Sequence, residues 1–545
     1  MKKKIVGAAL GTCVHVSGLY HFLKLAETAG YETELLGPAV SPERIIKAIK
    51  ENQPDIVAIS YRLTASVAKT LFAELKQLLE KHHLTTQRFV FGGTPPVAAI
   101  ARESGLFESV FSGIEPPDQI KGYLYEAGEK KKEAAFAQTL VERINQKYPY
   151  PLLRHHFGRP SLAETIAGVE EIAGSGLLDV ISIGPDQVAQ EHFFHPEEID
   201  VAQDGAGGVP VRKAADLEAI YAASRCGNYP LLRCYSGTRD LRQWAEMSVH
   251  TIHNAWGAIP LCWYSVMDGR SQRSLVEAIT ENKQTMGWYA SRNIPVEVNE
   301  SHQWSLRDAH DSLAVCLAFL AAYNAKQMGV RSYVSQLMFN TPPGTSAAMD
   351  IAKMLAKTEL IETLQDAHFT VYREVRAGIA HFSAHPEVAK GQLAASAVIS
   401  LALKPHILHV VGFSEGDHAV YSREIMESCN IIHGTLYNCL SGMPDLTRDS
   451  VVQERKEQLL SEAKVLLKAI QETGAAFSND PWSDPHVLAG AIQQGILDAP
   501  HFRGNPHLCG KITTRLINGA WYAVDAESGK ILLEQDRLKD SLKQI

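Results

Sequence analysis

The first 125 residues alternate between short apolar runs and amphipathic stretches. Residues 4–10 (KIVGAAL) form an apolar run of strand length, and residues 17–30 carry apolar side chains at helical spacing up to a stop at Gly30. The alternation continues with predicted strands at 32–37, 54–60 and 88–93 and predicted helices at 41–53 and 66–83. Strands that alternate with helices in this way predict a doubly wound parallel sheet, which binds ligands at the carboxyl ends of its strands.

The remainder of the chain repeats the strand and helix pattern on a larger scale. Residues 126–150 are charged, helix-prone and end in prolines, which is typical of a connector. Beyond them, about eight strand–helix units fit a (β/α)8 TIM-type barrel better than an open sheet. We place strands in this half at 177–184, 229–237, 258–265, 295–301, 331–339, 369–375 and 406–413. The predicted organisation is therefore a doubly wound domain at 1–125, a linker at 126–150, and a barrel with a C-terminal extension at 151–545.

Composition narrows the classes of function. A chain of 545 residues with 45% hydrophobic and 21% charged residues is too long for one ordinary core and too apolar to be disordered. The net charge of -8 argues against a nucleic-acid partner, because phosphate binding needs clustered Lys and Arg. The eight cysteines are scattered without a CxxC pair, which fits reduced thiols in a cytoplasmic protein. No stretch is long and apolar enough to span a bilayer, so we expect small-molecule partners and no membrane.

Several residues with binding chemistry fall at the ends of the first predicted strands. His15 follows the first strand, Ser60 ends the third, and Gly92 and Gly93 end the fourth. Imidazole is a good donor for a borderline metal, and paired glycines let a bulky ligand approach the backbone. The alternative is a loop histidine without a ligand and a glycine pair that only makes a tight turn.

The motifs at these positions resemble those of the cobalamin-binding domain of glutamate mutase and its relatives. They read CVHVSG at 13–18, ISYRL at 59–63, FGGTPP at 91–96 and SGIEPP at 112–117. The resemblance implies cobalamin as cofactor, with His15 as lower axial cobalt ligand, Gly18 as the loop glycine, and Ser60, Gly92 and Gly93 beside the displaced nucleotide tail. Adenosylcobalamin is the form it favours. The family holds its histidine through a carboxylate two residues earlier, and here that position is Cys13, so we expect a weaker or differently tuned cobalt bond.

The barrel half resembles the large subunit of glutamate mutase, as if the two subunits were fused. The similar stretches are SHQWS at 301–305, NTPPGTS at 340–346 and a closing segment at 495–511. Two features of that family are missing. Its substrate-binding arginine before a Gly-Thr is replaced by Tyr235-Ser236, and its lysine and glutamate that hold the adenosyl ribose are replaced by Asn340 and Gly344. Neither glutamate as substrate nor the adenosyl contacts therefore carry over directly.

The same resemblance defines the candidate site residues of the barrel. Arg159 and Arg212 fall where the family contacts anionic groups, although a surface ion pair is an equally good interpretation of each. Asn340 and Thr341 are candidates for cofactor binding. The residues assigned to catalysis are Arg159, Arg212, Arg233, Tyr235, Tyr264, His302 and Gln303, and Arg376 is among the further candidates at predicted strand ends.

The sequence leaves three functions open. The first is a cobalamin-dependent carbon-skeleton mutase, a radical isomerase acting on a small carboxylic acid substrate. The second is a corrinoid-dependent methyltransferase, which would explain the missing adenosyl contacts. The third is a corrinoid-binding sensor or carrier without mutase activity, although the sequence contains no DNA-binding or helical output segment. We further expect a homodimer.

Overall fold

The computed structural model describes residues 3–115, 117–126 and 133–542. The chain divides into two compact units, residues 1–132 and residues 133–545, and each is described by itself. Within the described residues, no helix is both long and apolar enough to cross a membrane.

The first unit is a five-stranded parallel sheet with helices on both faces. Its strands run in the order β2-β1-β3-β4-β5. Helices α1 and α5 pack on one face, and α2, α3 and α4 pack on the other. This arrangement confirms the predicted doubly wound fold. The elements are β1 (Lys4–Leu10), α1 (Ser17–Thr28), β2 (Glu32–Val40), α2 (Pro42–Asn52), β3 (Ile56–Tyr61), α3 (Ala65–Lys81), β4 (Arg88–Gly93), α4 (Pro95–Ser104), β5 (Ser109–Phe111) and α5 (Pro117–Glu126).

The second unit is a parallel barrel of eight strands, as predicted. Its strand order is β8-β7-β6-β13-β12-β11-β10-β9, so the last strand of the barrel pairs with the first. Between β8 and β9 the ring is joined by a hydrogen bond from Ala255 N to Leu232 O (2.8 Å). The strands are β6 (Leu152–Phe157), β7 (Val180–Ile183), β8 (Leu231–Cys234), β9 (Gly257–Ile259), β10 (Val296–Val298), β11 (Ser332–Met338), β12 (Thr370–Arg376) and β13 (Ile407–His409).

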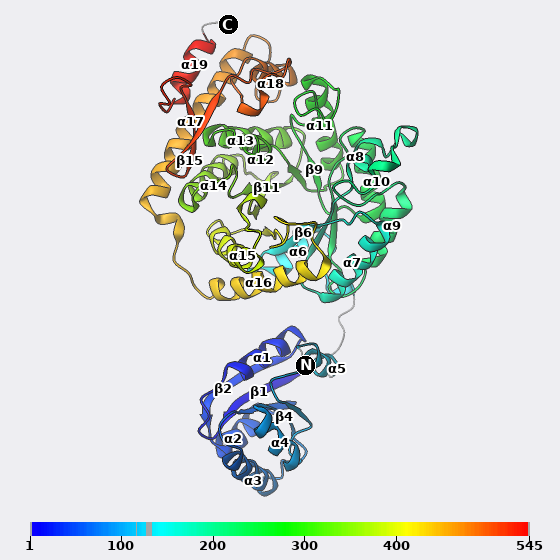
Figure 1. Ribbon diagram of the computed structural model, residues 1–545, viewed down its shortest axis with the longest axis vertical. Helices are drawn as coiled ribbons and strands as arrows, with labels where there is room; N and C mark the ends of the chain where they lie inside the picture. The colour runs from blue at the N-terminus through cyan, green and yellow to red at the C-terminus, as the bar shows by residue number, and fades with distance from the viewer. Residues whose placement is uncertain (1–2, 116, 127–132, 543–545) are drawn as a thin grey trace. The chain divides into compact units, whose positions relative to one another are not determined.

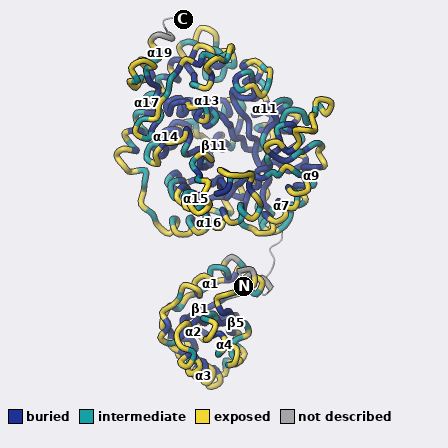
Figure 2. Tube along the Cα trace, in the orientation of Figure 1, coloured by how far each residue is buried: buried dark blue, intermediate teal, exposed yellow. Residues whose placement is uncertain are grey.

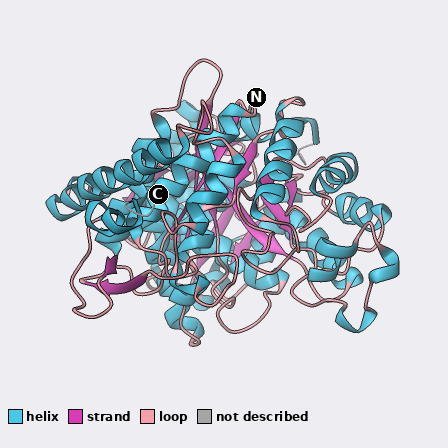
Figure 3. Ribbon diagram, turned by 90° about the horizontal axis from the view of Figure 1, so that it is seen from above, coloured by secondary structure: helices cyan, strands magenta, loops and turns pink. Residues whose placement is uncertain are grey.

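Helices surround the barrel strands (Figures 1 and 3), and burial is greatest at the centre of this unit (Figure 2). Each strand is followed by at least one helix before the next strand begins, which places helices outside and strands inside. The helices are α7 (Leu162–Ser175), α8 (Gln187–His192), α9 (Ala214–Ala223), α10 (Leu241–Ile252), α11 (Leu275–Ala290), α12 (Ser301–Ser305), α13 (Asp311–Gln327), α14 (Ala347–Glu362), α15 (Pro386–Leu401) and α16 (Ser422–Leu440).

Several barrel strands, among them β10 and β13, are shorter than the sequence predicts, and β6 and β9 differ for identifiable reasons. Strand β6, with the sequence LLRHHF, was not among the predicted strands because its inward positions are charged or polar. The predicted strand at 258–265 is present only as β9, which ends at Ile259. The chain leaves the sheet there because Pro260 has no N–H, and because the Glu300 carboxylate accepts hydrogen bonds from Leu261 N (2.8 Å) and Cys262 N (3.0 Å).

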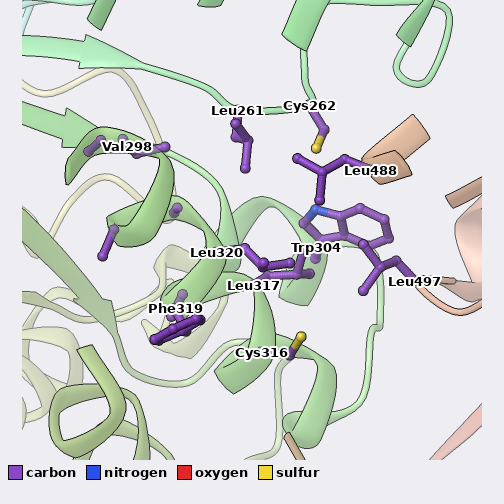
Figure 4. Close-up of a cluster of buried hydrophobic side chains, with 14 of the residues drawn as sticks. Leu261, Cys262, Val298, Trp304, Cys316, Leu317, Phe319, Leu320, Leu488 and Leu497 are labelled. Carbon is purple, nitrogen blue, oxygen red and sulfur yellow. The ribbon is translucent and has the colours of Figure 1, made fainter. Parts of the chain in front are cut away.

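The segments that flank the barrel also pack against it. Part of the predicted linker, residues 127–132, lies outside the described residues. Helix α6 (Leu140–Lys147) buries Leu140 and Ile144 against barrel-strand residues such as Leu152. After the barrel come α17 (Ser450–Gly474), α18 (Pro485–Gln493), a hairpin of β14 (Thr513–Ile517) and β15 (Ala520–Val524), and α19 (Glu534–Leu542). Figure 4 shows how this extension shares a core with α12 and α13, where Leu488 and Leu497 lie beside Trp304.

Candidate functional site

The loop between β1 and α1 presents the His15 side chain to solvent. Its neighbour Cys13 is fully buried, and the Cys13 Sγ lies 3.8 Å from His15 Nδ1. The loop is held by hydrogen bonds from Cys13 N to Leu10 O (3.2 Å) and from Ala39 N to Cys13 O (2.9 Å). With Nδ1 turned toward the thiol, Nε2 is the ring nitrogen left to bind a metal. Cys13 therefore stands beside the imidazole where the resemblance expects a carboxylate.

The other predicted residues of this unit line the same sheet edge. Ser60 is buried and donates a hydrogen bond to His15 O (3.4 Å), which ties the end of β3 to the β1–α1 loop. A Cβ added at Gly18 or Gly92 would meet no atom within 4 Å, so both positions border open space. Gly93 is different, because a Cβ there would lie 2.5 Å from Tyr61 O. Gly93 is thus required by packing within the sheet, whereas Gly92 leaves room beside the strand end.

Exposed apolar side chains gather at this edge of the sheet. Val14 (63% exposed), Leu63 (42%), Val67 (44%) and Ile114 (79%) follow the carboxyl ends of β1, β3 and β5. Since the strands are parallel, their carboxyl ends share one edge, and β1 and β3 flank the point where the strand order reverses. An apolar group of this kind around a switch point indicates a ligand with a broad apolar face.

The barrel interior contains a layer of charged residues where apolar side chains usually pack. Alternate strands contribute Arg154 (β6), Arg233 (β8), Glu297 (β10) and Glu374 (β12), and all four side chains are fully buried. Arg154 donates to Glu374 Oε1, and Arg233 donates to Glu297 Oε2 (2.9 Å). Gln336 of β11 donates to both carboxylates, at 3.1 Å and 3.3 Å. This floor layer is charge-balanced, with two guanidinium groups and two carboxylates.

A second polar layer lies two residues further along each of these strands. It consists of His156, Tyr235, Asn299 and Arg376, nearer the carboxyl ends, and we call it the mouth layer. The Tyr235 hydroxyl lies 2.8 Å from His156 Nε2, and the two rings stack with centroids 4.8 Å apart. His409, the last residue of β13, packs edge-on against His156.

Several buried atoms around the mouth layer have no hydrogen-bond partner among the described residues. They are His156 Nδ1, Asn299 Oδ1, His409 Nδ1, Gln336 Oε1, Glu374 Oε2, and Nε and Nη1 of Arg233. Buried polar atoms are nearly always satisfied, so a group of unsatisfied ones at the carboxyl ends of barrel strands indicates a ligand site.

The electrostatics of this region keep its histidines neutral. Burial, together with Arg154, lowers the pKa of His156 and His409 well below the usual value. Burial and then Arg376 lower the pKa of His302 to about 3. All three imidazoles are therefore uncharged at neutral pH and act as neutral hydrogen-bonding groups.

The structure brings together some of the predicted barrel residues and separates others. Arg233, Tyr235 and His302 lie in or near the mouth layer, and Gln303 Nε2 is 3.5 Å from His302 Nε2. Tyr264 is buried close to Tyr235, where burial raises its pKa.

Arg159 and Arg212 have partners of their own outside the mouth layer. Arg159 donates to Ala419 O (2.7 Å) and stacks on the Tyr421 ring at 4.0 Å. Arg212 forms a bidentate pair with Asp186, at 3.0 Å and 2.6 Å. Arg159 Nε also lies 3.5 Å from Glu164 Oε2, so each arginine has a carboxylate partner, as the ion-pair interpretation expects. The catalytic role of both residues stays a prediction.

The NTPPGTS loop is anchored from below by a buried charge network. Lys353 donates to Asp311 Oδ1 (3.1 Å) and to Thr341 O (2.8 Å), and Asn340 N donates to Asp350 Oδ2 (2.6 Å). The Thr341 hydroxyl is buried and donates to Phe339 O (3.0 Å). Of the two residues predicted to contact the cofactor in this loop, Thr341 already uses its hydroxyl hydrogen, whereas Asn340 is held here through its backbone N–H and not through its side chain.

Most of the floor and mouth layers were not predicted from the sequence. Arg154, His156, Glu297, Asn299, Glu374 and His409 were not candidates, whereas Arg376 was one, at a strand end that the pattern places correctly. The available signal was a polar residue repeated at a spacing of two inside apolar strands, as in LLRHHF and TVYREVR.

Comparison with known proteins identifies the first unit. Residues 3–113 match the family model described as B12 binding domain. A solved structure of a novel cobalamin-binding protein from Desulfitobacterium hafniense DCB-2 is 29% identical, over 22% of this chain and 57% of that chain, with a TM-score of 0.20. The cobalamin-dependent S-adenosylmethionine radical enzyme OxsB is 11% identical over 92% of this chain and 72% of that chain, with a TM-score of 0.17. No curated protein matches.

Residues 3–113 are accordingly a B12-binding domain, which confirms cobalamin as the cofactor. The local structure fits this group. An exposed imidazole with a free Nε2, open space beside Gly92 and an apolar edge suit a metal inside a broad, largely apolar ring.

Proposed function

We propose that the protein is an adenosylcobalamin-dependent carbon-skeleton mutase acting on a small carboxylic acid. The proposal assigns cofactor binding to the domain at 1–125 and substrate binding to the barrel at 151–545. The observation that carries it is the mouth layer, where polar atoms without a partner among the described residues lie at the carboxyl ends of the barrel strands. The same chain contains a B12-binding domain.

Each group of residues has a distinct task in this proposal. When bound, the cofactor supplies a carbon-centred radical that can take hydrogen from an unactivated C–H bond. His15 would bind the cobalt through its free Nε2, with Cys13 beside its Nδ1. In the barrel, the Tyr235–His156 pair and Arg376 orient the substrate, and the buried floor layer beneath them excludes water. Neutral histidines suit such a site, because no proton transfer to the substrate is needed for a radical rearrangement.

A corrinoid-dependent methyltransferase is the second candidate, and the NTPPGTS loop favours it. Thr341 and Thr345 donate their hydroxyl hydrogens to backbone carbonyls within the loop, at 3.0 Å and 2.7 Å. The hydrogens of both hydroxyls are therefore already used within the protein, and a ribose would find fewer hydrogen-bond donors here than a mutase needs.

The deciding experiment mixes the full chain anaerobically with adenosylcobalamin and a panel of small carboxylic acids. A mutase gives an electron paramagnetic resonance signal that requires both cofactor and acid, together with an isomerised product. Tight binding of methylcobalamin with methyl transfer and no such signal would replace the mutase by the methyltransferase.

The panel is repeated with His15→Ala and with His21→Ala as a matched control. His21 is an exposed histidine of α1 in the same unit, six positions further along. We expect His15→Ala to abolish the signal and His21→Ala to keep it.

A further inference from the structure

The inward-facing charges of the barrel do not cancel. Six charged residues occur in the eight strands, and one of them, Arg373, belongs to the outer surface, where it pairs with Glu362 of α14 (2.5 Å). The other five are Arg154, Arg233 and Arg376 and the carboxylates Glu297 and Glu374. The floor layer uses both carboxylates for Arg154 and Arg233. Arg376 is left as one formal positive charge in excess.

The Arg376 guanidinium is placed to receive a ligand. The residue is 9% exposed, and within the described part of the chain its side chain makes one hydrogen bond, from Nε to Ala377 O (3.3 Å). Arg376 stands opposite His409 in the β12–β13 pairing, and after burial it contributes to the lowered pKa of His409, His156 and His302. These three histidines of the mouth are therefore uncharged. The Glu415 carboxylate, whose pKa Arg376 helps to lower, already accepts a hydrogen bond from Gly412 N (2.7 Å) and lies 2.9 Å from His155 Nε2.

We infer that the barrel mouth takes a monocarboxylate, and that Arg376 is the residue that binds its carboxylate. This inference deepens the proposed function and rests on it for the reaction, although the binding itself does not. A terminal guanidinium edge matches a carboxylate with two parallel hydrogen bonds. Asn299 Oδ1, His409 Nδ1 and His156 Nδ1 remain for neutral polar groups on the rest of the molecule.

Charge balance selects one carboxylate rather than two. A monocarboxylate neutralises the excess charge of Arg376, whereas a dicarboxylate would leave its second negative charge buried among neutral imidazoles. Such an unpaired buried charge is costly. The other arginines suggested as anion contacts do not supply a second site, because Arg212 is already paired with Asp186 and Arg159 donates to Ala419 O.

The test is a binding titration of the full chain without cobalamin, so that it does not depend on turnover. Butanoate, its neutral isostere butanamide, and pentanedioate are titrated by calorimetry or by ligand-observed nuclear magnetic resonance. We expect butanoate to bind at least tenfold more tightly than pentanedioate. Arg376→Gln should weaken butanoate about tenfold or more, because it removes a charge-assisted pair, and should leave butanamide unchanged.

Two further variants make the result decisive. Arg376→Lys keeps the positive charge but loses the two parallel donors of the guanidinium. Its butanoate affinity should lie between those of the wild type and Arg376→Gln. Arg373→Gln removes an arginine from the outer side of the same strand and should bind butanoate as the wild type does. Equal butanoate affinity of Arg376→Gln and the wild type, or tighter binding of pentanedioate, overturns the inference. If butanoate binding depends on Arg376 but no acid is isomerised, the inference stands and the mutase proposal fails.

Discussion

Gly92 and Gly93 are neighbours at the end of β4, and the structure predicts opposite effects for the same substitution at the two positions. A Cβ at Gly92 meets nothing within 4 Å, and the backbone there is not in the left-handed region. Gly92→Ala should therefore stabilise the unliganded first unit by roughly 0.5 to 1 kcal/mol, because alanine loses less conformational entropy on folding than glycine. If the cofactor tail lies against Gly92, the added methyl group should at the same time weaken cobalamin binding.

At Gly93 the same substitution is expected to lower the stability of the first unit instead of raising it. The new Cβ would lie 2.5 Å from Tyr61 O and 2.7 Å from the Phe91 ring, and both neighbours are fixed, one by the backbone of β3 and one by the core. Overpacking of this kind costs about 1 to 3 kcal/mol. Gly93→Ala should therefore destabilise the first unit even without cofactor.

Both variants can be measured in the intact chain. Hydrogen–deuterium exchange of peptides from β3 and β4 reports the stability of the first unit separately from the barrel. An absorbance titration reports cobalamin affinity. A stable Gly93→Ala protein would refute the packing argument, and a Gly92→Ala protein that binds cobalamin like the wild type would remove Gly92 from the cofactor site.

Four other outcomes follow from the same geometry. His15→Ala should weaken corrinoid binding and shift the absorbance spectrum toward the base-off form. Cys13→Asp should strengthen the histidine–cobalt bond. Unchanged spectra would exclude His15 as cobalt ligand and Cys13 as its neighbour in the site. Glu297→Ala should destabilise the barrel by about 3 to 5 kcal/mol in a denaturant titration, because it leaves Arg233 and Trp256 Nε1 without their shared acceptor. Glutamate should not be converted to 3-methylaspartate, since Tyr235 stands where the resemblance to glutamate mutase expects a substrate-binding arginine. Product detected by chromatography would contradict this. Burial, and then Lys353, lower the pKa of Lys357 to about 7, so the unfolded chain binds more protons than the folded one between pH 7 and 10.5. Barrel stability should therefore rise with pH across that window. Lys357→Met should stabilise the barrel by on the order of 4 kcal/mol at pH 7 and by little near pH 10.5.

The alternation of strands and helices was readable because the strands of the first sheet are continuous apolar runs and the helices carry apolar residues on one face. Strand β3, for example, is buried along its whole length, and α2 carries its apolar residues at helical spacing. The same rule explains why β6 was missed. Its inward face carries Arg154 and His156, so it lacks the apolar pattern that marks the other strands.

The barrel site could not be assembled from local sequence because its parts are distant along the chain. Arg154 and Glu374 are 220 positions apart and meet only when β13 pairs with β6 and closes the ring. Arg233 and Glu297 are 64 positions apart and meet across β9. His15 was easier to assign, since the loop that presents it is a single short segment with a recognisable spacing.

The two layers of the barrel depend on one another through strand geometry. Because side chains alternate along a strand, residues two positions apart face the same interior and differ in height by one layer. Each of four strands places a charged residue in the floor and a polar one above it: Arg154 below His156, Arg233 below Tyr235, Glu297 below Asn299, and Glu374 below Arg376. Each guanidinium of the floor is ion-paired with a carboxylate of the floor, so neither carboxylate is paired with Arg376 above them. Arg154 of the floor donates to His156 Nε2 (3.1 Å) and, after burial, helps to lower the pKa of that imidazole. A floor of apolar residues would lack this contact. Burial and the floor guanidinium of Arg154 together keep His156 and His409 neutral, and because the floor carboxylates pair with Arg154 and Arg233, neither of them pairs with Arg376.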